Sequence, residues 1–192
     1  LSDALRRFFD WRPQIILLPR SACHRVTIDV KGIAKRFLNS SIRLQLLQIT
    51  GLSDIGFAWH IKTDAEGKNS AEVWYWDEAN LRQSGSIPPG ELLLNGLLPC
   101  PEMLFRPALA DGLHLIECQT GYEAVALRAG QLYRTRWFAE IPSPNIWQAF
   151  VRDAGGNIHL SIDQAAPPAA QKLTAIAKLP NFWKIVTGLQ KP

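Results

Sequence analysis

The chain has 192 residues, of which 47% are hydrophobic and 20% charged, so it is long enough to bury a core of its own. Its net charge of +4 is mild for a nucleic-acid-binding protein, and no predicted helix is basic along a whole face. The three cysteines form no Cys-x-x-Cys pair, and no apolar run approaches the roughly 18 residues of a membrane span. The composition therefore argues against a disulfide scaffold and a zinc knuckle, and it favours a reducing compartment.

Hydrophobic periodicity predicts that residues 1–82 form a first α/β lobe. The elements that we predict there, in chain order, are an amphipathic helix at 1–9, strands at 14–18 and 22–30, a helix at 33–49, and strands at 55–61 and 71–76. The longer helix should turn an apolar stripe toward the core. That stripe comprises Ala34, Phe37, Leu38, Ile42, Leu46 and Ile49.

A second lobe is predicted over residues 102–165, after a proline- and glycine-rich hinge at 83–101. Its predicted elements are a three-stranded meander at 113–118, 122–128 and 132–138, a helix at 144–150 and a strand at 157–162. The remaining residues, 166–192, are predicted to be a helical tail whose last helix reaches residue 186. This succession of elements predicts an α/β fold, mixed α+β in character, with two related halves rather than a Rossmann unit.

Residue types that commonly carry catalysis or bind metals show no functional pattern. The four histidines lie in predicted strands, and the nearest His–Cys pair, His114 and Cys118, would be about 13 Å apart along a strand. Cys23 and His24 point to opposite faces, and Cys100 is expected to be exposed without a basic neighbour. The chain also lacks a Gly-x-Ser-x-Gly motif, a P-loop and a dinucleotide fingerprint. We therefore predict no catalytic residue, no metal ligand and no cofactor.

The stretch at 122–138, YEAVALRAGQLYRTRWF, is the second hairpin of the meander, and its last strand mixes arginine with aromatic residues. It is either a half-buried hairpin that merely folds or a protein-binding site, because arginine beside tryptophan is typical of interface hot spots. We predict that the face with Tyr133 and Trp137 packs on the helix that follows. Arg134 and Arg136 would then point outward and bind the carboxylates of a protein partner.

The basic residues gather near the N-terminus. Residues 1–43 carry nine basic and three acidic side chains, a net charge of +6, which leaves −2 for the rest of the chain. A basic end of this kind could face an anionic membrane, a nucleic acid or an acidic protein. The charge pattern favours an ordinary solvated face over these partners.

Two segments together resemble a known family. One is ILLPRSACHRVTIDVKGIAKRFLNSSIRLQLLQI, and the other is DGLHLIECQTGYEAVALRAGQLYRTRWF, which is followed by WQAF. Over residues 10–160 this layout resembles the actin-like cytoplasmic domains of bacterial secretion and pilus assembly proteins, GspL of type II secretion and PilM of type IV pili. The resemblance implies a two-lobed, actin-like (RNase H-like) architecture with antiparallel meanders and flanking helices.

The resemblance also implies a function. Such a domain is a non-catalytic scaffold on the cytoplasmic side of the bacterial inner membrane, where it docks an assembly ATPase or another protein of the machinery. A homodimer is possible, and no nucleic acid is expected as a partner. The tail at 166–192 would lead toward a membrane span that follows residue 192.

The nucleotide site of the actin fold is where the sequence departs from that family. An actin-type site uses an Asp-x-Gly loop, whose backbone amides cradle phosphate. The matching turn in the second half, ECQTGYE, has Glu117 and Gly121 but no Asp-x-Gly, and the turn PRSACH in the first half has no glycine. Three alternatives stay open: an actin-like nucleotide-binding protein with weak ATPase activity, a nucleic-acid-binding module, and an unrelated α/β domain.

Overall fold

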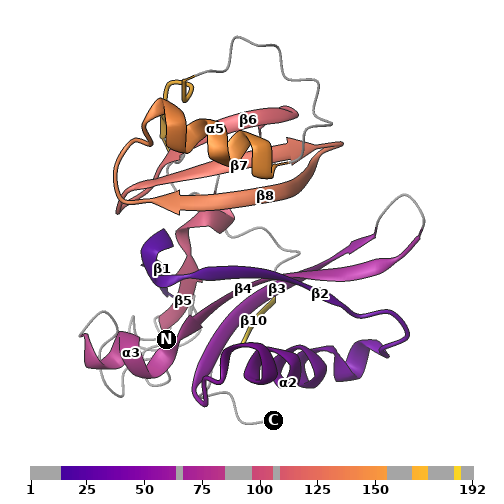
Figure 1. Ribbon diagram of the computed structural model, residues 1–192. Helices are drawn as coiled ribbons and strands as arrows, with labels where there is room; N and C mark the ends of the chain where they lie inside the picture. The colour runs from indigo at the N-terminus through magenta and orange to yellow at the C-terminus, as the bar shows by residue number, and fades with distance from the viewer. Residues whose placement is uncertain are drawn as a thin grey trace, which may run out of the picture. The chain divides into compact units, whose positions relative to one another are not determined.

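The protein consists of two compact units, which we call unit 1 and unit 2. The computed structural model describes residues 14–63, 67–84, 97–105, 109–154, 166–172 and 184–186 (Figure 1). Of these, unit 1 contains 14–18, 22–63, 67–84, 97–101 and 184–186, and unit 2 contains 19–21, 102–105, 109–154 and 166–172. The helix predicted at 1–9 and the strand predicted at 157–162 lie outside the described residues.

Unit 1 is built on a four-stranded antiparallel sheet with the order β10-β3-β4-β2. Its strands are β2 (His24–Asp29), β3 (Ile55–Thr63), β4 (Asn69–Asp77) and β10 (Lys184–Val186). The β3–β4 hairpin is regular along its whole length, from Ile55 opposite Asp77 to Thr63 opposite Asn69. Strand β10, where the sequence predicts the end of a helix, instead pairs with β3. Its Ile-Val pair is β-branched, which suits a strand.

Helix α2 (Leu38–Thr50) covers one face of this sheet. Leu38, Ile42 and Leu46 are its buried residues, and they pack on the apolar residues of all three long strands. Phe37 and Ile49, which the predicted stripe placed in the core, are 53% and 59% exposed. For Phe37 the reason is that residues 35–37 form the 3₁₀ turn η2, and the α-helical spacing starts only at Leu38. Ile49 keeps the spacing of Ile42 and Leu46 but lies in the last turn of the helix.

A two-stranded parallel ladder completes the regular structure of unit 1. It joins β1 (Gln14–Leu18) to β5 (Leu97–Pro101), from Gln14 opposite Leu97 to Leu18 opposite Pro101. The sequence predicts β1 but not β5, which lies in the expected hinge and contains two prolines. The short helix α3 (Glu78–Gln83) follows β4, and the Asp77 side chain caps it by accepting a hydrogen bond from the Asn80 amide at 3.0 Å.

Unit 2 repeats the plan of sheet and covering helix. Its sheet has the order β8-β7-β6-β9. The elements are η1 (Arg20–Ala22, of which Ala22 falls in unit 1), η3 (Glu102–Phe105), β6 (Gly112–Glu117), β7 (Tyr122–Arg128), β8 (Gln131–Phe138), α5 (Pro144–Asp153) and β9 (Gln171–Lys172). Trp147 and Phe150 of α5 are fully buried against Leu113, Leu115, Ala124 and Ala126 of β6 and β7.

The turn between β7 and β8 shows why this hairpin forms where the sequence predicts it. Ala129 and Gly130 both have positive φ angles, 50° and 70°, as a tight two-residue hairpin turn requires. The Asp111 carboxylate accepts hydrogen bonds from both of their amides, at 2.7 and 2.8 Å, and holds the turn. The fold class is thus mixed α/β with antiparallel meanders and flanking helices, which confirms the prediction. None of the described helices is long and apolar enough to cross a membrane.

Candidate functional site on strand β8

Strand β8 ends the sheet of unit 2 and carries the arginines that the sequence predicts to bind a partner. Its register with β7 places Phe138 opposite Tyr122, Arg136 opposite Ala124 and Arg134 opposite Ala126. The three β7 residues of these pairs lie on the face that packs on α5, and Phe138 joins that core. The arginines therefore lie on the helix-covered side of the sheet.

The prediction that the Tyr133 and Trp137 face packs on the following helix is wrong. Tyr133 is 54% exposed, and Trp137 is half-buried on the opposite face. The physical reason is that α5 packs on the small alanines of β7 and on β6, so it needs from β8 only one apolar side chain, which is Phe138. The alternation of side chains along β8 alone does not show which face of the strand the helix covers.

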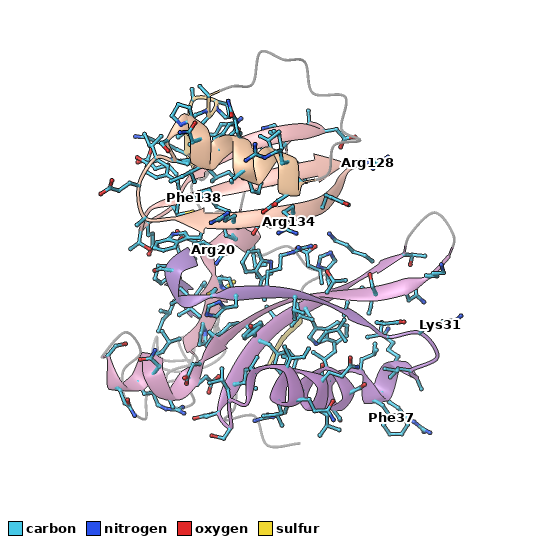
Figure 2. All side chains as sticks on the ribbon, viewed as in Figure 1. Arg20, Lys31, Phe37, Arg128, Arg134 and Phe138 are labelled. Carbon is cyan, nitrogen blue, oxygen red and sulfur yellow. The ribbon has the colours of Figure 1, made fainter. Side chains whose placement is uncertain are left out.

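Arg134 and Arg136 are nonetheless exposed, as predicted, because β8 lies at the margin of the surface that α5 covers. Arg134 lies 3.6 Å from the carboxylate of Asp153 on α5, and both side chains are 51% exposed. Arg136 lies over the ring of Phe138, 5.3 Å from its centroid. Figure 2 labels Arg134 and Phe138 among the side chains of unit 2. Exposed contacts of this kind contribute about 0–1 kcal/mol, so neither contact prevents an arginine from binding another carboxylate.

The opposite face of β8 is anchored by a buried ionic cluster. The hydroxyl of Thr135 donates to the carboxylate of Glu123 on β7, and Glu123 is fully buried. Arg20 Nε lies 2.7 Å from the same carboxylate, and an Arg20 terminal nitrogen lies 3.5 Å from the Thr135 hydroxyl. Trp137 Nε1 donates to the carbonyl oxygen of Thr120 at 2.8 Å. These contacts hold β8 in place while its two arginines extend from the other side.

Sequence analysis missed the roles of Arg20 and Glu123. A signal for Glu123 does exist, since it shares a strand face with Val125 and Leu127, and a carboxylate on an apolar face needs a buried cation. The identity of that cation could not be found in the same way. Arg20 lies far upstream, in a short irregular turn with no pattern that connects it to β7.

A second carboxylate, that of Glu102, lies in the same cluster and is 1% exposed. Its Oε1 accepts a hydrogen bond from the Arg20 amide at 2.5 Å, and its Oε2 accepts one from the Gln119 amide at 2.8 Å. Burial, together with the negative charges of Glu102 and Glu123, raises the pKa of Cys118 to about 12. This thiol therefore carries almost no thiolate near neutral pH.

The other candidate chemical groups are structural too. Cys100, which was expected to be exposed, is fully buried, and burial raises its pKa to about 12. His24 packs beside Tyr75 with ring centroids 5.3 Å apart, and His114 Nε2 lies 2.8 Å from the Ala110 carbonyl oxygen. His159 lies outside the described residues. In the part of the chain that the structure describes, no group of three or more His, Cys, Asp and Glu side chains could hold a metal ion.

The turn between β6 and β7, which matches a phosphate loop of the resembled fold, does not fit a nucleotide phosphate. The Cys118 amide donates to the Gly121 carbonyl oxygen at 3.0 Å, and the Gln119 amide donates to Glu102. Both amides therefore already have acceptors within the protein. This turn, Glu117 to Tyr122, also contains no Asp-x-Gly sequence whose carboxylate could position a metal ion.

The basic residues of unit 1 present a second charged surface. Lys31, Lys35 and Arg36 are exposed, and the guanidinium carbon of Arg36 lies 4.7 Å from the ring centroid of Phe37. Leu44, on α2, is 61% exposed. A role for this surface at an anionic membrane stays a prediction.

No protein-family profile matches the chain, and no curated protein matches it. Among solved structures, the chain is similar to the cytoplasmic domain of EpsL, an inner membrane component of the type II secretion system of Vibrio cholerae. The alignment covers 92% of this chain and 68% of that one, with 16% sequence identity and a TM-score of 0.47. That domain is of the class of secretion protein that the sequence resembles.

Proposed function

We propose that this chain is a non-catalytic scaffold domain on the cytoplasmic side of a bacterial inner membrane. It docks a protein of a secretion or pilus assembly machine, in the first place the assembly ATPase, and Arg134 and Arg136 bind that partner. The observation that carries this proposal is the pair of exposed arginines on a strand whose other face is fixed by Thr135 and Trp137. A rigid support of this kind lowers the entropy that a docking site loses on binding.

The geometry of β8 also suggests the chemistry of the partner. Arg134 and Arg136 are alternate residues of one strand, so their side chains leave the same face about 6.6 Å apart. Guanidinium groups prefer carboxylates, which they bind through two parallel hydrogen bonds. Carboxylates on alternate residues of an extended partner segment have the same spacing. The partner segment that fits best is therefore acidic and extended.

Burial at the centre of a docking site usually comes from aromatic side chains. Tyr133 is 54% exposed and lies between the arginines and the β7–β8 turn, on the opposite face of the strand. A segment that runs along β8 can contact Tyr133 and both arginines. Its residues would then alternate between acidic and apolar, because neighbouring residues of a strand face opposite sides.

The experiment that tests the proposal measures binding of the purified assembly ATPase to the chain by surface plasmon resonance. In the double variant Arg134→Ser and Arg136→Ser, we expect affinity to fall at least about tenfold, since each charge-assisted hydrogen bond contributes about 1.5–3 kcal/mol. The matched control is Arg36→Ser with Arg43→Ser, which removes the same charge from unit 1. We expect the control to bind as the unmodified chain does.

Two outcomes would contradict this assignment. Equal loss in both double variants would mean that net charge, and not β8, governs binding. Full binding by the β8 variant would place the docking surface elsewhere. A third variant, Arg134→Lys with Arg136→Lys, keeps the charge but loses the forked geometry, so we expect it to bind with intermediate affinity.

A further inference from the structure

The carboxylate of Glu102 joins two turns that are distant in sequence. The donor amides are those of Arg20, 82 residues upstream, and of Gln119, 17 residues downstream, and each bonds a different carboxylate oxygen. Arg20 follows β1 and Gln119 follows β6, so both donors lie in turns that connect two strands. Arg20, Gln119 and Glu102 all belong to unit 2.

Backbone amides that converge on one point form an anion-binding position, and strand turns that bind phosphate work in this way. Here the anion is supplied by the chain itself. We propose that Glu102 is a built-in anion, which fills the position where these turn amides would otherwise take a phosphate or another small anion. The two turns are then held together permanently, and no nucleotide is needed to order them.

The charges around this position favour the carboxylate of Glu102 and exclude a phosphate. The Arg20 guanidinium lies 2.7 Å from the carboxylate of Glu123 and is engaged there. A phosphate that approached the Gln119 amide would meet the negative charges of the Glu102 and Glu123 carboxylates. Burial is the main cause of the raised pKa of Cys118, and Glu102 and Glu123 raise it further, which is consistent with this negative potential.

The burial of Glu102 supports the same conclusion. At 1% exposure, its carboxylate is shielded from water, and a buried carboxylate is stable only when its oxygens accept hydrogen bonds. The two amides supply one bond to each oxygen. The amides and the carboxylate therefore satisfy each other's hydrogen-bonding needs. Removal of the carboxylate would leave two amide donors without an acceptor, and a small anion could take its place and accept both hydrogen bonds.

The test uses the full chain and formate, which has the same charged group as the glutamate side chain. In Glu102→Ala, the unfolding midpoint should be lower than in the unmodified chain and should rise as formate is added. With formate at tenfold its dissociation constant, the rise should be about 3–5 °C. Chloride at equal ionic strength should have little effect, and formate should not shift the midpoint of the unmodified chain. Equal responses of the two proteins to formate would overturn the proposal.

A second measurement does not depend on whether Glu102→Ala folds. In the unmodified chain, the amide protons of Arg20 and Gln119 should exchange slowly with solvent and resonate downfield, because each donates to a buried carboxylate. Rapid exchange at both amides would overturn the proposal. Calorimetry with ATP and magnesium gives another test. If the unmodified chain bound ATP at micromolar concentration, and Glu102→Ala bound it no more tightly, the proposal would also be overturned. This inference is independent of the docking role of β8.

Discussion

Unit 1 and unit 2 each bury a glutamate in an inner strand of a helix-covered sheet, on the face away from the helix. In unit 1 it is Glu72 of β4, which is 1% exposed, and in unit 2 it is Glu123 of β7. Glu72 has two cations from neighbouring strands of its own sheet, Arg25 at 3.3 Å and Lys62. Glu123 pairs with Arg20, which comes from outside the sheet.

The difference concerns where charge compensation comes from. In unit 1 the sheet brings its own cations to the carboxylate when its strands pair, and there are two of them. In unit 2 the guanidinium that compensates Glu123 is that of Arg20 in η1, so the stability of this unit depends on a segment far upstream. A buried carboxylate is costly without a partner. We therefore expect the two units to respond unequally to the loss of one arginine.

The largest effect should follow Arg20→Ala. This change leaves Glu123 buried without the guanidinium that pairs with it, which typically destabilises a protein by about 3–5 kcal/mol. Urea denaturation with hydrogen exchange, which reports on each unit separately, measures the loss. We expect the exchange protection of β6, β7 and β8 to fall most. Protection that falls equally in both units would break the comparison.

A second contrast compares two glycines with similar backbone angles. Gly121 in unit 2 has φ of 73°, and a Cβ there would lie 2.2 Å from the Phe138 carbonyl oxygen. Gly51, the C-cap of α2 in unit 1, has φ of 71° with open space around it. Gly51→Ala should cost about 1–2 kcal/mol from backbone strain alone, and Gly121→Ala about 3 kcal/mol because a clash is added. If thermal unfolding showed equal losses of stability in the two variants, the turn at Gly121 would be able to shift and relieve the clash.

Arg25→Ala in unit 1 is the counterpart of the Arg20 change. Lys62 still pairs with Glu72 in this variant, so the carboxylate keeps a cation. We expect a loss of about 1.5–3 kcal/mol, typical of one hydrogen bond to a charged group. The same urea and hydrogen-exchange measurement applies. A loss as large as that of Arg20→Ala would mean that Lys62 does not compensate.

The smallest effect should be that of Arg134→Ser with Arg136→Ser on stability. Both side chains are exposed, and their contacts with Asp153 and Phe138 are at the surface. The free energy of unfolding should stay within about 1 kcal/mol of that of the unmodified chain. If this variant unfolds, then the arginines are internal structure, and a loss of partner binding could not be assigned to docking.

Elements with a strong local signal were predictable from the sequence. The period-2 alternation gave the β6–β7–β8 meander, and the turn at Ala129-Gly130 set its second hairpin. Strands β5 and β10 were missed because their formation depends on the partner strands β1 and β3, which lie far away in the chain. Local propensity carries little information about such pairings.

The candidate site was predictable only in part, for the same reason. Arg134 and Arg136 are exposed as predicted but for another reason, since they lie at the margin of the helix-covered face and not on the open one. Which face of β8 the helix covers depends on how α5 packs on β6 and β7, and the periodicity of one strand does not determine this. Glu102, Arg20 and Glu123 come from three separate segments, so only the folded chain reveals their cluster.

The position of the segment at 19–21 in unit 2 affects how the chain can fold as a ribosome synthesises it. This segment is synthesised early but packs with unit 2, whose strands appear only after residue 111. Strand β10, which completes the sheet of unit 1, is made after all of the described parts of unit 2. Unit 2 therefore cannot pack its first segment until residues up to 101 of unit 1 have been made, and unit 1 cannot complete its sheet until the described parts of unit 2 have been made. Assembly should be late and slow, as for other chains that depend on contacts between distant residues.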